Sequence, residues 1–149
     1  MLKLKTILFC SVAILRKVKF RKEVYILTRV KNFHLWKIFF ENCILTTESP
    51  NNCCILKDAS IILISNFATS ISGNVYIIGK KFSNKKCVYK SPLPSSLFNC
   101  FRVSHLLEFE AWPISDIDKK IMLFPDRKYY AAIPLLHCEI SYVYINVFL

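Results

Sequence analysis

The stretch Ile61-Ile-Leu-Ile-Ser-Asn-Phe-Ala-Thr-Ser-Ile-Ser-Gly-Asn-Val-Tyr-Ile-Ile78 decides the fold that we predict for this chain. It belongs to a segment, Ala59–Gly79, that holds no charged residue over 21 positions, a length typical of a membrane-spanning helix. However, seven polar residues interrupt the segment, and Ser72-Gly73-Asn74 is a turn signal between two runs rich in Ile and Val. We therefore predict a β-hairpin, with a membrane span as the alternative.

Two elements are predicted before this hairpin. Glu23–Val30 is rich in β-branched and aromatic residues, which predicts a strand. In His34–Leu45 the spacing of the apolar residues places Leu35, Ile38 and Phe39 on one helical face. We therefore predict an amphipathic helix there.

The region after the hairpin contains several turn signals. Ser115-Asp-Ile-Asp118 is typical of a helix N-cap and predicts a helix over 117–124. Residues 97–110 fit a helix or a strand equally well, whereas Ile140–Leu149 alternates apolar and polar residues as a strand does. The turns and loops that we predict are 82–86, 91–96 and 125–128, with a short strand over 87–90.

The length of 149 residues predicts a single domain, and the predicted mixture of helices and strands places it in the α+β class. A loop over 46–52 containing Pro50 divides the chain into two parts. The first, 1–46, is a basic, apolar N-terminal segment, either helix or strand. The second, 53–149, is predicted to be a β-rich domain, with strands from about residue 55 onward.

The positive charge is unevenly distributed. The chain has a formal net charge of +11, and residues 1–40 contribute +9, from ten Lys and Arg against the single acid Glu23. The remaining residues, 41–149, carry eleven basic residues against nine acids. Within them, a second basic cluster comprises Lys80, Lys81, Lys85, Lys86 and Lys90.

The N-terminus combines an apolar run, Thr6–Leu15, with the basic run Arg16–Lys22. The apolar run is shorter than the roughly twenty residues that span a bilayer. No small-residue cleavage site follows it, as a secretory signal peptide requires. The pair of runs favours attachment to a membrane surface, and nuclear or mitochondrial targeting stays open. The residues predicted to contact a membrane or polyanion are Arg16, Lys17, Lys19, Arg21 and Lys22.

Few residue patterns suggest catalysis or metal binding. Only two glycines, Gly73 and Gly79, are present, so a Gly-rich phosphate loop is excluded. The seven cysteines contain no C-x-x-C pair, and we predict free, mostly buried thiols without a metal. Ser104–His105 and His137–Cys138 are the nearest approach to a nucleophile with a base, but sequence neighbours point in different directions on a strand or helix. We therefore predict no catalytic residue, no cofactor and no small-molecule substrate.

These observations predict a non-enzymatic accessory protein that binds an anionic membrane surface through its N-terminal segment. One alternative is a basic nucleic-acid-binding module, because aromatic residues such as Phe20, Tyr25 and Trp36 lie among the basic ones and can stack on bases. Another is the product of a marginal open reading frame without an evolved activity, which the skewed composition allows.

Overall fold

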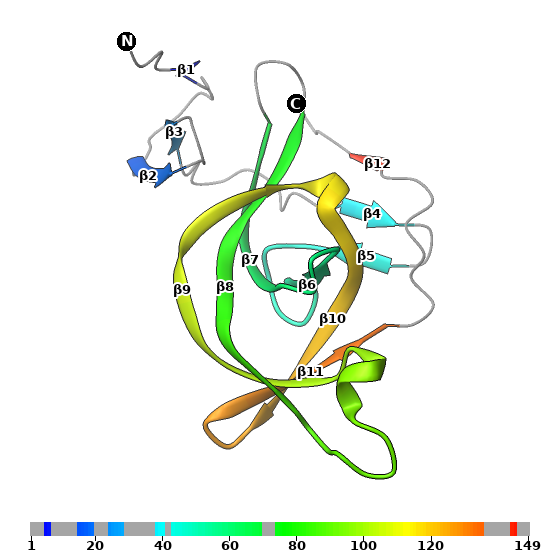
Figure 1. Cartoon of the computed structure of the whole chain (residues 1–149). Coiled ribbons are helices and arrows are strands. Elements are labelled where there is room, and N and C mark those ends of the chain that lie inside the picture. The colour runs from blue at the N-terminus through cyan, green and yellow to red at the C-terminus, as the bar shows by residue number, and fades with distance from the viewer. Residues whose placement is uncertain are drawn as a thin grey trace.

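The computed structural model describes residues 5–6, 15–19, 24–28, 38–40, 43–69, 74–135 and 144–145, with side chains for Ile38, 43–68 and 74–135. Strands make up most of this part of the chain (Figure 1). Their bounds are β1 Lys5–Thr6, β2 Leu15–Lys19, β3 Val24–Thr28, β4 Ile38–Phe40, β5 Cys43–Leu45, β6 Cys53–Leu56, β7 Ile61–Thr69, β8 Val75–Cys87, β9 Phe101–Pro113, β10 Ile117–Asp126, β11 Tyr129–Pro134 and β12 Tyr144–Ile145.

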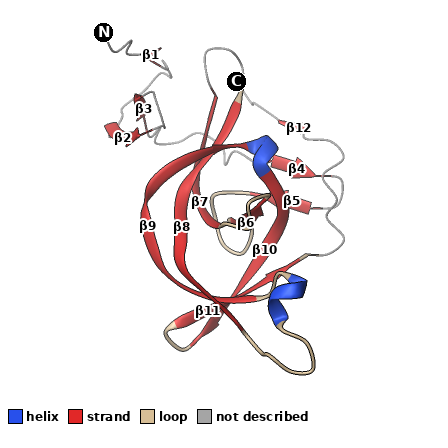
Figure 2. Cartoon of the chain, viewed as in Figure 1, coloured by secondary structure: helices blue, strands red, loops and turns tan. Residues whose placement is uncertain are grey.

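Six of these strands close into an antiparallel barrel in the order β10-β11-β9-β8-β7-β6. Two short three-stranded sheets accompany it, β1-β3-β2 and β12-β4-β5. The described helical turns are both of the 3₁₀ type, η1 at Ser95–Phe98 and η2 at Ile114–Asp116 (Figure 2). The β-rich prediction is therefore confirmed, whereas the helical half of the α+β class is wrong for the described residues.

The predicted hairpin is confirmed. Strands β7 and β8 are antiparallel neighbours, from Ile62 opposite Lys81 to Thr69 opposite Val75. The ladder shifts register between Ile64 and Asn66, where one extra residue in β7 forms a bulge. Ser72 and Gly73 of the predicted turn lie outside the described residues.

The barrel closes because the chain passes from β9 to the edge formed by β6 before it forms the hairpin of β10 and β11. After η2, β10 pairs with β6, and β11 then returns between β10 and β9. The main-chain N–H of Lys57, just after β6, donates to the Asp116 carbonyl oxygen in η2 at 2.8 Å. Buried residues from all six barrel strands form the interior cluster: Cys53, Ile55, Ile61, Phe82, Phe101, Val103, Ile121 and Ala132.

A second apolar cluster lies on the other face of β6 and β7. Successive strand residues point to opposite faces, so Cys53 and Ile55 belong to the interior cluster while Cys54 and Leu56 belong to this one. Ile38 of β4 and Leu45 of β5 pack into the second cluster. Both faces of β6 are therefore covered, which explains why all four of its residues are buried and apolar.

Three local predictions are wrong, and of the short strand predicted over 87–90 only Cys87 lies in a strand. Residues 38–40 and 43–45 of the predicted helix 34–45 form the paired strands β4 and β5. The predicted helix over 117–124 is strand β10, because its backbone pairs with β6 and β11 to close the barrel. The predicted turn at 82–86 lies inside β8, where Ser83 and Asn84 bond across to His105 on β9.

Other predictions are confirmed at least in part. The strand predicted at 23–30 is β3, and the open choice at 97–110 is decided in favour of a strand, since β9 occupies 101–113. The loop predicted at 91–96 is present and runs into η1. In the strand predicted at 140–149, the described residues are β12, which pairs with β4.

Candidate functional site

The N-terminal residues predicted to bind a membrane or polyanion are only partly described. Arg16, Lys17 and Lys19 lie in β2, opposite Leu27, Ile26 and Val24 of β3. Arg21 and Lys22 lie outside the described residues. The structure therefore brings three of the five predicted residues onto one short strand, next to an apolar strand.

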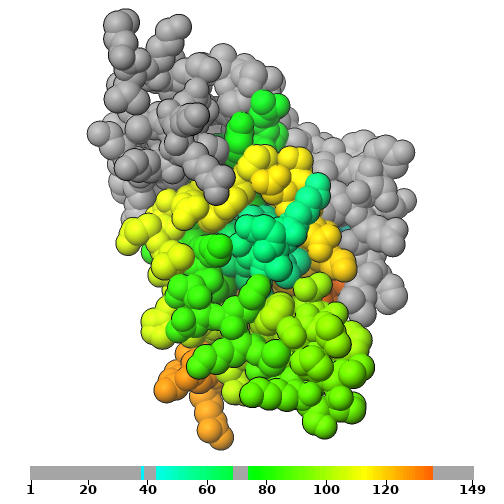
Figure 3. All heavy atoms as spheres, viewed as in Figure 1, coloured from blue at the N-terminus to red at the C-terminus, as the bar shows by residue number. Residues whose placement is uncertain are grey.

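A second basic surface lies at the end of the barrel that carries the β8–β9 loop (88–100) and the β10–β11 turn (127–128). We call it the basic end. The two segments project at the bottom of Figures 1 and 3. From Lys80 to Leu107 the sequence holds six basic residues and no acid.

Two lysines of β8 contribute to the fold itself. The Lys85 ammonium donates to the Ala59 carbonyl oxygen at 2.7 Å and lies 4.6 Å from the centre of the Phe101 ring. Lys80 lies 4.6 Å from the centre of the Phe109 ring. By contrast, Lys86 and Lys90 are exposed at the basic end, and no acid forms an ion pair with them among the described residues. These two lysines are available to an anionic partner.

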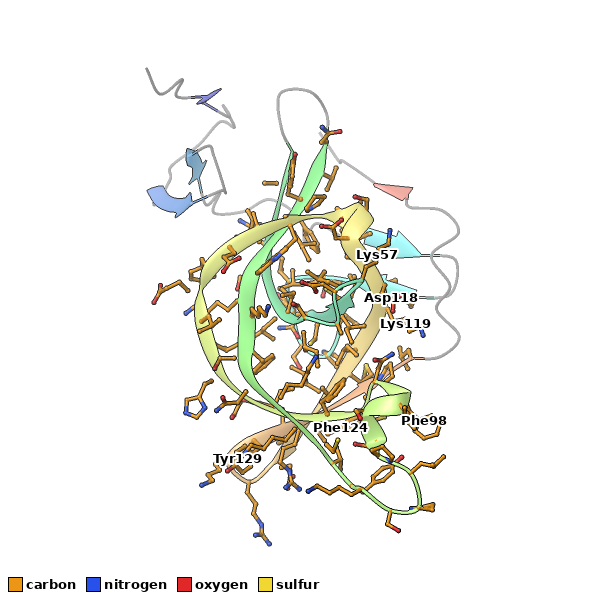
Figure 4. All side chains as sticks on the ribbon, viewed as in Figure 1. Lys57, Phe98, Asp118, Lys119, Phe124 and Tyr129 are labelled. Carbon is orange, nitrogen blue, oxygen red and sulfur yellow. The ribbon has the colours of Figure 1, made fainter. Side chains whose placement is uncertain are left out.

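The β10–β11 side of the basic end carries further cations around one aromatic ring. Arg102 forms an ion pair with Asp126 at 2.9 Å. The Tyr129 ring lies 5.7 Å from the Arg102 guanidinium and 5.3 Å from the Lys128 ammonium. Figure 4 shows Tyr129, Phe124 and Phe98 at this end, apart from Lys57, Asp118 and Lys119.

The β8–β9 loop is held in place by one buried serine. The Ser95 hydroxyl accepts a hydrogen bond from the Val88 N–H and donates one to the Cys100 carbonyl oxygen, both at 2.8 Å. Its main chain bonds to Tyr89 and Cys100 at 3.0 Å. Because Ser95 is fully buried and bonds to both ends of the loop, the loop has a defined shape.

The same loop exposes large apolar side chains. Leu97 is 65% exposed, Leu93 52% and Phe98 50%, and Tyr89 next to Lys90 is 46% exposed. Sequence reasoning missed this group. The available signal was the presence of Leu93, Leu97 and Phe98 within a loop otherwise rich in Pro and Ser and beside a lysine cluster.

The Ser104–His105 pair is close in space but is not arranged as a nucleophile with a base. The Ser104 hydroxyl lies 3.1 Å from His105 Nδ1, and the Asn84 amide nitrogen lies 3.0 Å from the same Nδ1. In a catalytic triad the nucleophile and the orienting acid contact opposite ring nitrogens. Here both neighbours contact one nitrogen, and the second neighbour is an amide. His137 and Cys138 lie outside the described residues.

The described cysteines lie in two environments, one buried and one partly exposed. Cys53 and Cys54 are fully buried, and desolvation raises the pKa of both thiols well above the usual value. Cys87 and Cys100 are free thiols that are partly exposed, and Cys43 is also partly exposed. The prediction of free thiols is confirmed for Cys53, Cys54, Cys87 and Cys100, and burial is confirmed for Cys53 and Cys54. No group of three or more His, Cys, Asp or Glu in the described ranges is placed to hold a metal ion.

One buried charge secures the loop that follows β5. Lys120 of β10 is 6% exposed, and its ammonium donates to the Asn51 side-chain oxygen. Thr46 N–H also donates to the Asn51 carbonyl oxygen at 2.8 Å. Lys120 therefore holds the loop over 46–52 against the barrel, and it faces away from solvent.

The match to a family model covers residues 19–135, described as a domain of unknown function (DUF8592). The chain belongs to the DUF8592 family. The DUF8592 match runs from the end of β2 to the end of β11, so it contains the whole barrel and the basic end. Neither a curated protein nor a solved structure matches the chain. In the described part of the chain, no helix has the length and apolar character that crossing a membrane requires.

Proposed function

We propose that this DUF8592 protein is a non-enzymatic accessory protein that binds peripherally to an anionic membrane surface through residues 1–40. The observation that carries the proposal is the charge of +9 on this segment beside the apolar run Thr6–Leu15. An apolar run too short to span a bilayer still adds hydrophobic attachment, and each Lys or Arg near an anionic surface adds about 1 kcal/mol. Together these terms make reversible attachment favourable.

The described N-terminal strands support both the hydrophobic and the electrostatic contribution to membrane binding. In β2, three of five residues are basic, and the facing strand β3 is Val-Tyr-Ile-Leu-Thr. Cations and apolar residues are therefore adjacent within one hairpin. A lipid headgroup region attracts the cations and accepts the apolar residues at the same depth. The geometry of Ser104 and His105 supports a non-enzymatic role, because Ser104 and the Asn84 amide both contact the same imidazole nitrogen, Nδ1.

Nucleic acid is the second candidate partner, and the surroundings of Tyr129 favour it. Cations beside an aromatic ring can bind phosphate while the ring stacks on a base. However, Arg102 and Lys128 already lie within 6 Å of the Tyr129 ring centre, which limits its access to a base. We therefore prefer the membrane.

The test is cosedimentation of the full chain with phosphatidylcholine vesicles, with and without phosphatidylserine. Replacing Arg16, Lys17, Lys19, Arg21 and Lys22 by Gln is expected to release most of the protein bound to the phosphatidylserine vesicles. A matched comparison sets Arg16→Gln with Lys17→Gln against Lys57→Gln with Lys119→Gln, which removes equal charge elsewhere. Equal binding by these two variants, or binding of the parent to oligonucleotides alone, would contradict the proposal.

A further inference from the structure

The basic end contains a projecting group of apolar side chains that the fold does not cover. Leu93, Leu97 and Phe98 are each at least half exposed, and all belong to the β8–β9 loop. In Figure 1 this loop projects from the barrel at the opposite end from β2 and β3. An exposed cluster of this kind on a small domain marks an interaction surface.

The loop is preorganised for contact with a partner. Ser95 ties Val88 and Tyr89 on one side of the loop to Cys100 on the other through the hydrogen bonds described above. Asn99 takes a left-handed conformation with φ of 55° and its N–H donates to the Ser96 carbonyl oxygen at 3.1 Å. A loop held in one shape loses less conformational entropy when it binds.

The charges around the loop indicate the chemistry of the partner. Lys90 lies in the same loop as the apolar side chains and Lys86 lies just before the loop, both are exposed, and the sequence has no acid between Lys80 and Leu107. Tyr89, which has an apolar ring and a polar hydroxyl, lies between Val88 and Lys90 and is 46% exposed. Side chains of this type collect where a hydrocarbon layer meets water.

The shape and composition of the loop favour lipid over the other polyanions. Leu93 and Leu97 are aliphatic and cannot stack on bases, so they add nothing to nucleic-acid binding. Inserted into a bilayer, they leave water while the neighbouring ammonium groups remain at the headgroups.

We propose that the β8–β9 loop is a second membrane-binding site, in which Leu93, Leu97 and Phe98 insert into an anionic leaflet while Lys86 and Lys90 bind its headgroups. This inference rests on the proposed function, since it assigns a second contact to the same partner. The loop site can nevertheless be tested separately from the N-terminal site, because the loop and the N-terminal strands lie at opposite ends of the barrel and can be altered one at a time.

The experiment measures cosedimentation with phosphatidylcholine–phosphatidylserine vesicles for four full-length proteins. These are the parent, the five-Gln N-terminal variant, a loop variant with Leu93→Gln, Leu97→Gln and Phe98→Gln, and the combination of both. The N-terminal variant is expected to keep residual binding, and adding the loop substitutions is expected to weaken that binding at least about tenfold. Lys86→Gln and Lys90→Gln, made in the N-terminal variant, are each expected to weaken it about fivefold.

The control is Leu106→Gln with Leu107→Gln, two β9 residues that are 42% and 44% exposed outside the loop. This pair is expected to leave binding unchanged. If the N-terminal variant does not bind at all while the parent does, the loop site is overturned and the proposed function stands. If the N-terminal variant binds as well as the parent and the loop substitutions abolish binding, the loop site stands and the role of residues 1–40 fails.

A second measurement reports insertion directly and does not depend on a loss of binding. Phe98→Trp places an indole in the loop, and vesicles with brominated acyl chains quench only indoles that enter the bilayer. We expect quenching of this variant beyond that of the parent, whose own Trp36 and Trp112 set the background. Leu107→Trp serves as the control and is expected to show the background level. Vesicle-bound Phe98→Trp protein without added quenching, or retention of oligonucleotides alone through Lys86 and Lys90, would overturn the site.

Discussion

Gly79 lies directly opposite Ile64 in the β7–β8 ladder, beside the bulge that shifts the register of β7. A Cβ atom at Gly79 would overlap the main-chain carbonyl of Leu63 and press on the Ile62 side chain. Glycine is therefore required here for the close approach of two strands, since any side chain would force them apart. One of the two glycines of the chain therefore allows β7 and β8 to pack closely in the barrel.

The first prediction concerns this close approach. Gly79→Ala is expected to lower the free energy of unfolding by about 1–3 kcal/mol, because a well-packed wall must shift to admit the methyl group. Denaturant unfolding of the purified protein measures it. Ser65→Ala, at an exposed position of the same bulge, is the control and is expected to change stability little. Equal stability of Gly79→Ala and the parent would show that the strands separate freely.

The second prediction follows from the scarcity of glycine in turns. Arg127, in the two-residue turn between β10 and β11, has φ of 55°, a conformation that costs a non-glycine residue about 1–2 kcal/mol. Arg127→Gly is expected to stabilise the protein by about 0.5–1 kcal/mol, after allowance for the greater chain entropy of glycine in the unfolded state. Lys128→Gly removes the same charge at a position without positive φ and is expected to destabilise. Thermal unfolding measures the stability of the two variants. A Lys128→Gly variant more stable than the Arg127→Gly variant would contradict the proposed strain at Arg127.

The third prediction concerns thiol reactivity. Hydrogen bonds from Ser96, with a smaller contribution from the Lys90 charge, lower the pKa of the Cys87 thiol. Since the thiolate is the reactive form, alkylation of Cys87 by iodoacetamide is expected to persist to lower pH than alkylation of an ordinary cysteine.

Peptide mass spectrometry over a pH series gives the midpoint of Cys87 alkylation, and Ser96→Ala is expected to raise it. Cys53 and Cys54 are internal controls, since their buried thiols are expected to react only after unfolding. A Cys87 midpoint that is unchanged by Ser96→Ala would exclude the Ser96 hydroxyl as a cause of the lowered pKa.

The hairpin formed by β7 and β8 was predictable, because a turn signal separated two runs rich in β-branched residues. The helix predicted over 34–45 failed for a geometric reason. Ile38 and Leu45 are seven residues apart, which places them on one face of a helix, yet in the structure they face each other across a tight pair of strands. The spacing fits both structures, and burial against β6 and β7 decides between them.

The basic end was only half predictable. Its lysine cluster is visible in the sequence, and so is the loop at 91–96. The exposure of Leu97 and Phe98 is not visible there, because it depends on Ser95 being buried and bonding to both sides of the loop. The approach of Arg102 to Asp126 likewise joins β9 to the end of β10, which only the closed barrel brings together.

The most direct measurement for peripheral membrane association is fractionation of the tagged full-length protein from cells into soluble, salt-released and detergent-released pools. Attraction between exposed charges is screened beyond about 8 Å at physiological ionic strength and more strongly at higher salt. We therefore predict that the protein sediments with membranes at low salt and leaves them in a high-salt wash. Recovery in the soluble pool at low salt, or retention on membranes until detergent is added, would contradict the account.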